Sequence, residues 1–74
     1  MVKAAVLVTA SPGKVDDVAK KLGRLGAKDV LVVAGRVDAV VFLEGSTTEV
    51  TGKIKAMFEV EGVETTETLW EVES

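Results

Sequence analysis

The sequence contains no cysteine, histidine, tyrosine or asparagine. Without cysteine there can be no disulfides or thiolate metal sites, and without histidine the usual imidazole ligand, general base and catalytic triads are missing. No phosphate-binding glycine loop or metal-ligand cluster takes their place. We therefore expect a protein that is not an enzyme, has no catalytic or metal-binding residues and needs no cofactor.

Long hydrophobic runs and clustered positive charge are also missing. Hydrophobic residues make up 47% of the 74 positions, but each uncharged run is too short to span a bilayer, and no basic leader with a cleavage site opens the sequence. Nine basic residues are scattered among twelve acidic ones, which argues against direct contact with nucleic acid. We expect a cytoplasmic protein that binds neither membranes nor DNA by itself.

The short length predicts one small domain over residues 1–74. A domain of this size buries only about 60% of the surface of its unfolded chain, so a single copy has little stability to spare. Because disulfides and metal sites are excluded, association with further copies is the remaining way to gain stability.

Four stretches rich in β-branched and apolar residues predict strands, at residues 2–10, 30–34, 37–43 and 63–72. Gly35 suits a tight hairpin turn between the middle two. On the third strand one alternate set, Val37, Ala39, Val41 and Leu43, carries no charge and is assigned to the core. The other set, Asp38, Val40, Phe42 and Glu44, is apolar in the middle and charged at its ends, which is typical of a surface that contacts a partner.

Two helices are predicted between these strands. Ser11 is expected to cap the first, whose apolar residues recur at spacings of three and four from Val15 to Leu25. Ser46 and Glu49 form a capping box for the second, which is weakened by a glycine at position 52. With right-handed crossovers, this order gives a ferredoxin-like α+β fold: a four-stranded antiparallel sheet with both helices on one face. The bare face predicts self-association.

The turn Gly35-Arg36-Val37-Asp38 permits two interpretations. It is an ordinary hairpin turn in which the Asp38 carboxylate binds neighbouring amides. Alternatively, a guanidinium and a carboxylate displayed together hold the two charged ends of a small zwitterion. Thr65, Thr66 and Thr68 are by default strand residues chosen for β propensity, and the alternative is that their hydroxyls line a polar pocket.

Three segments give the chain a family resemblance. They are Ser11-Pro12-Gly13-Lys14, the strand Val30 to Val33 followed by Gly35-x-x-Asp38, and the closing Gly62-Val63-Glu64-x-Thr66-x-Thr68-Leu69. In these the chain resembles the effector-binding and oligomerisation domain of the Lrp/AsnC (feast/famine) transcriptional regulators. This is the RAM domain, named for regulation of amino acid metabolism, here in the stand-alone form without a helix-turn-helix.

The resemblance implies a regulatory module that binds an amino-acid effector. It implies dimers of the dimeric α+β barrel type that assemble into octamers or decamers and bind the effector between dimers. Two roles stay open: co-assembly with a full-length Lrp/AsnC-type regulator, or a simple amino-acid-binding oligomer. The ligand-binding residues it implies are Gly35 and Asp38 of the turn together with Thr66 and Thr68 of the last strand. Arg36 and Val37 fill the variable positions of the turn and are expected to tune which ligand fits.

Two other functions remain open from the sequence: a cofactor-free enzyme of the dimeric α+β barrel type, and a purely structural assembly domain. An enzyme is expected to enclose a pocket with acid and base groups within one dimer. A sensor is expected to place Gly35 and Asp38 between dimers.

Overall fold

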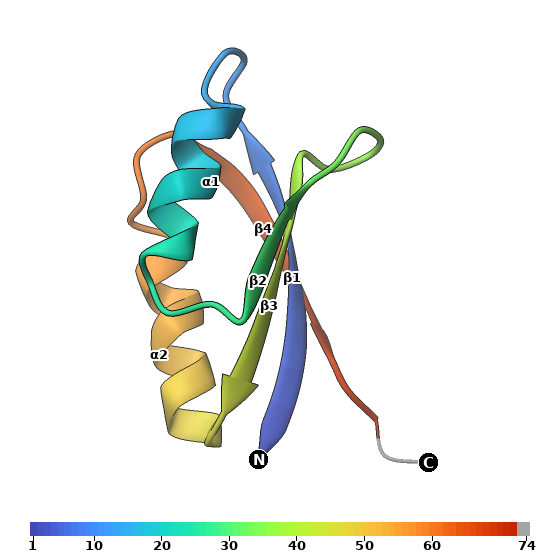
Figure 1. Ribbon diagram of the computed structural model, residues 1–74, viewed down its shortest axis with the longest axis vertical. Coiled ribbons are helices and arrows are strands. Elements are labelled where there is room, and N and C mark those ends of the chain that lie inside the picture. Colours follow the sequence, from blue (N-terminus) through green and yellow to red (C-terminus); the bar gives the residue numbers. More distant parts are fainter. Residues whose placement is uncertain (73–74) are drawn as a thin grey trace.

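Two helices cover one face of a four-stranded sheet in the computed structural model, which describes residues 1–72 (Figure 1). In chain order the elements are β1 (Val2–Ala10), α1 (Val15–Gly23), β2 (Asp29–Val32), β3 (Ala39–Gly45), α2 (Thr47–Met57) and β4 (Val63–Trp70). The strands lie in the order β2-β3-β1-β4, and all neighbours are antiparallel. The predicted ferredoxin-like βαββαβ fold is confirmed. Positions 73 and 74 of the predicted domain lie outside the described residues.

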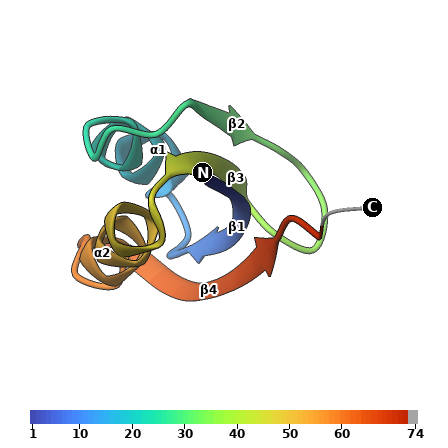
Figure 2. The same ribbon diagram turned by 90° about the horizontal axis from the view of Figure 1, so that it is seen from below.

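The strand register decides which side chains share a face of the sheet. Val6 on β1 pairs with Val41 on β3 and Thr68 on β4, and directly paired residues point to the same side. Val6 and Val41 are fully buried beneath the helices. The next residue, Leu7, pairs with Glu67 and points to the opposite side, which carries no helix of the described chain (Figure 2). We call this side the open face.

The core lies between the sheet and the helices. Ala39, Val41 and Leu43 are buried in it, as their alternation on the third strand predicts. The same prediction was wrong for Val37, because β3 begins at Ala39 and Val37 lies half-buried in the preceding loop. The helices contribute the buried residues Val18, Leu22, Val50, Ile54 and Met57.

The two helix starts differ. At α2 the predicted capping box is confirmed: Glu49 N–H donates to Ser46 Oγ, and Ser46 N–H donates to Glu49 Oε1. The bond from the Ser46 backbone lowers the pKa of Glu49. At α1 the Ser11 cap was wrong, because the helix begins after Lys14 without a side-chain cap. Ser11 instead extends the β1–β4 pairing, its N–H donating to Gly62 O at 2.8 Å.

Neither helix of the described chain is long and apolar enough to cross a membrane.

Gly62 is expected to be irreplaceable. Its φ is +99°, and a β-carbon there would lie 2.7 Å from Cγ2 of Val18 in the core. The strained backbone and the clash together predict that Gly62→Ala lowers the free energy of unfolding by about 1–3 kcal/mol. Urea denaturation measures this change.

Gly52 supplies a matched control with the opposite sign. It lies within α2, and apart from its chain neighbours and the backbone of its own helix, no atom of the described residues would lie within 4 Å of a β-carbon there. Gly52→Ala therefore raises the free energy of unfolding by about 0.5–1 kcal/mol, because alanine favours the helix without a clash. Equal effects of the two substitutions would contradict the close approach of Gly62 to Val18 of α1.

Candidate functional site

The β2–β3 connection is longer than the tight turn that the sequence predicts. The two strands stop at Val32 and restart at Ala39, and residues 33–38 form a loop closed by a bond from Val33 N–H to Asp38 O at 3.0 Å. In Figures 1 and 2 the loop leans away from the helices, toward the open face. Its side chains can therefore reach over the sheet.

A pocket of about 370 Å³ opens where this loop approaches the open face. Residues of β1, β4 and the loop line it: Leu7, Thr9, Arg36, Val37, Thr65 and Glu67. β1 and β4 supply facing pairs, because Leu7 pairs with Glu67 and Thr9 pairs with Thr65. The loop adds the remaining wall.

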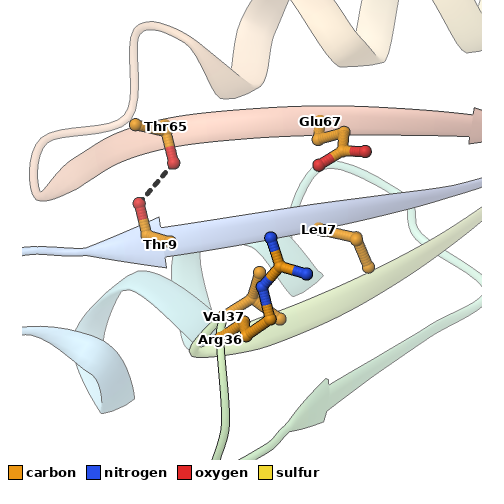
Figure 3. Close-up of a pocket in the computed structure, with 6 residues that line it drawn as sticks. All are labelled: Leu7, Thr9, Arg36, Val37, Thr65 and Glu67. Carbon is orange, nitrogen blue, oxygen red and sulfur yellow. Dashed lines mark hydrogen bonds between the residues drawn. The ribbon is translucent and has the colours of Figure 1, made fainter.

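Opposite charges lie within this pocket. Figure 3 shows the Arg36 guanidinium extending from the loop toward β1, with the Glu67 carboxylate on the strand beyond it. Both residues are exposed, and among residues 1–72 no salt bridge joins the two. The Thr9 and Thr65 hydroxyls are hydrogen-bonded to each other beside them. The pocket thus contains both a hydrogen-bond donor group, the Arg36 guanidinium, and an acceptor group, the Glu67 carboxylate.

Of the four residues predicted from the turn, only some line the pocket. Arg36 and Val37 line the pocket, whereas Gly35 precedes them in the loop and does not line it. The Asp38 carboxylate is directed to β1, where its Oδ2 accepts a hydrogen bond from Ala10 N–H at 2.8 Å. The structure therefore brings two of these four residues together at the pocket.

Of the three threonines on β4 that the sequence singles out, Thr66 and Thr68 lie on the other face. Thr66 pairs with Val8, whose side chain is fully buried under the helices, and Thr68 occupies the same side of the strand. Both are half-buried. Their neighbours Thr65 and Glu67 point to the pocket instead. The sequence does not reveal this, because both alternate sets of β4 carry polar residues.

An apolar patch lies next to the pocket on the open face. Its members are Leu31, Val40, Phe42 and Leu69, and we call it the open-face patch. Three of the four are exposed, and Val40 pairs with the pocket residue Leu7. A pair between Lys3 Nζ and Glu44 Oε2 at 3.9 Å lies beyond it. An apolar centre with a charged rim is typical of a surface that contacts another protein.

Comparison with known proteins finds similarity in solved structures. No protein-family model and no curated protein matches the chain. TTHA0845 from Thermus thermophilus is 26% identical, with a TM-score of 0.91 over 100% of this chain and 96% of its own. The protein called FFRP-DM1 is 25% identical, with a TM-score of 0.85 over 97% of this chain and 100% of its own.

A longer protein shares the fold over about half its length. An AsnC family transcriptional regulator from Agrobacterium tumefaciens has a TM-score of 0.78 at 12% identity. The match covers 99% of this chain and 51% of that regulator. The expected likeness to a domain of such regulators is confirmed at the level of the fold.

Proposed function

We propose that this chain is a self-assembling regulatory module that binds a free amino acid, because it resembles the RAM domain of Lrp/AsnC regulators over almost all its length. The observation that carries the proposal is the placement of Arg36 and Glu67 in one pocket, with no salt bridge between them among the described residues.

The charges of the pocket match those of a zwitterion. A guanidinium such as that of Arg36 binds a carboxylate through two parallel hydrogen bonds, and the Glu67 carboxylate accepts hydrogen bonds from an ammonium group. The Thr9 and Thr65 hydroxyls supply further acceptors. A ligand with a single charge would leave one of the two protein charges unpaired. The arrangement therefore favours an amino acid over a simple anion or cation.

The apolar lining limits the size of the ligand's side chain. Leu7 and Val37 form the apolar part of a pocket of about 370 Å³, near the lower end of the roughly 300–1,000 Å³ usual for small-molecule sites. We expect a small aliphatic side chain to fit against these two residues.

The open-face patch supports self-assembly. It is apolar, it lies on the face that no described helix covers, and a domain this small gains stability from burying it. We propose a dimer formed through this face, of the dimeric α+β barrel type, as the unit of an octamer or decamer. By co-assembling with a full-length Lrp/AsnC-type regulator, the module would let the bound amino acid affect DNA binding by that regulator.

Thermal unfolding in the presence of each standard amino acid tests the proposed ligand. A ligand that binds only the folded state adds about 2.7 kcal/mol at a hundred times its dissociation constant. For a domain of this size that raises Tm by roughly 10–20 °C. The matched control is the same amino acid acetylated at its nitrogen and amidated at its carboxyl, which has neither charge. An equal rise with the blocked compound would contradict a site for the two charges of an amino acid. No rise with any amino acid would contradict the proposal and favour a structural assembly domain.

A cofactor-free enzyme is the second candidate, because the pocket lies on the face that a second copy would enclose and Glu67 is an acid–base group within it. Glu67→Gln separates the two functions. If Glu67 anchors an ammonium, the substitution weakens binding by about tenfold or more. If Glu67 is a general base, binding persists while turnover, followed by NMR of the added compound, is lost.

A further inference from the structure

We infer that Asp38 is a positioning residue that holds Arg36 over the pocket rather than a residue that contacts the ligand. The inference deepens the proposed function and rests on it. It starts from the bonds that Asp38 already makes in the chain: its carboxylate, its N–H and its carbonyl each have a backbone partner.

Asp38 fastens the end of the loop to the end of β1 at two points. Its N–H donates to Val8 O at 2.9 Å, and its Oδ2 accepts from Ala10 N–H at 2.8 Å. The β1–β3 ladder ends at the pair Val8 and Ala39, so Ala10 lies beyond its last paired residue. The Asp38 carboxylate takes the place of the missing strand as the acceptor for Ala10.

This position of β1 is irregular and has particular need of an acceptor. The pairing of β1 with β4 shifts register between Thr9 and Ala10, as happens where a strand bulges. An amide left unpaired there would destabilise the end of the strand that carries Thr9 into the pocket. The carboxylate therefore stabilises a pocket wall as well as the loop.

The same residue closes the loop from which Arg36 extends. Asp38 O accepts from Val33 N–H at 3.0 Å, which fixes both ends of the segment between them. Arg36 and Val37 are the two residues before Asp38, and both line the pocket, whereas Asp38 does not. The three backbone bonds of Asp38 thus determine where the Arg36 guanidinium lies. The Asp38 carboxylate itself is hydrogen-bonded to the backbone of Ala10.

Two substitutions at Asp38 test this role. Asparagine keeps an oxygen that can accept from Ala10 N–H but has no charge, whereas alanine has no acceptor. We expect Asp38→Asn to bind the amino acid found by the thermal screen nearly as well as the wild type. We expect Asp38→Ala to weaken that binding by about tenfold, measured by calorimetry. If Asp38→Asn loses as much affinity as Arg36→Met, the carboxylate contacts the ligand and the inference is overturned.

NMR of the ligand-free protein supplies a readout that does not depend on the proposed ligand. In the wild type and Asp38→Asn we expect slow hydrogen exchange at the Ala10 amide and NOEs between the Arg36 side chain and the Leu7 methyls. In Asp38→Ala we expect both to be lost. NOEs that survive unchanged in Asp38→Ala would overturn the inference. If no amino acid binds the wild type, the proposed function fails, but these NOEs still decide whether Asp38 positions Arg36. If Asp38→Ala does not fold, the affinity of Asp38→Asn decides whether the carboxylate contacts the ligand, because this substitution removes only the charge and keeps the acceptor oxygen.

Discussion

Arg36→Met is expected to weaken amino-acid binding strongly while the fold stays intact. Arg36 is exposed, lies in a loop and takes part in no salt bridge among residues 1–72, so the substitution removes no contact that the core needs. It does remove the only cation among the described residues that line the pocket. A bidentate charge-assisted bond to a carboxylate is worth about 3 kcal/mol, so its loss weakens binding by about a hundredfold. Calorimetric titration measures the change.

Two variants control this experiment. Arg24→Met removes an exposed arginine at the C-cap of α1, outside the pocket, and should leave affinity unchanged. Arg36→Lys keeps the charge without the planar fork and should fall between the wild type and Arg36→Met. The assignment of Arg36 is wrong if Arg24→Met weakens binding as much as Arg36→Met does.

Phe42→Glu is expected to convert the assembled protein into monomers. The Phe42 side chain is 38% exposed on the open face, and it pairs with Ala5, which in turn pairs with Leu69 of the open-face patch. A second copy covering the patch would bury this position, so the substitution forces an unpaired charge into the contact. The cost of such a charge is several kcal/mol, which weakens association by more than about a hundredfold. Light scattering at micromolar concentration measures the molecular mass.

Phe58→Glu is the matched control for the self-assembly experiment. Phe58 is more exposed than Phe42, at 60%, but it lies at the C-cap of α2 on the helical side. The same change of side chain there should leave the assembly intact. A wild-type protein that is monomeric at micromolar concentration would refute self-assembly, and dissociation by Phe58→Glu alone would place the contact on the helices.

The fold could be predicted largely from local patterns. β-branched runs, the Ser46–Glu49 capping box and the alternation of Ala39, Val41 and Leu43 all depend on near neighbours in the chain, and the structure agrees with each. The prediction that Ser11 caps α1 was wrong because the Ser11 N–H donates a hydrogen bond to Gly62 O, far along the chain. A cap and a strand end look alike when that distant partner is not known.

The candidate site was less predictable, because it depends on contacts between distant segments. Arg36, Val37 and Thr65, which the sequence singles out, line the pocket, whereas Thr66 and Thr68 do not, and Glu67 was not predicted. The face that each residue of β4 occupies is fixed by its pairing with β1, and polar residues on both alternate sets conceal it. Likewise, the bond from Ala10 to Asp38 depends on a register shift that the sequence does not mark.

The most direct test of the pocket as an amino-acid site is an NMR measurement of intermolecular NOEs between the bound amino acid and the protein's methyl groups. We predict NOEs from the ligand's α and side-chain protons to the methyls of Leu7 and Val37, which line the pocket. NOEs to Thr66 or Thr68 on the opposite face, with the methyls of Leu7 and Val37 unaffected at saturation, would contradict the account.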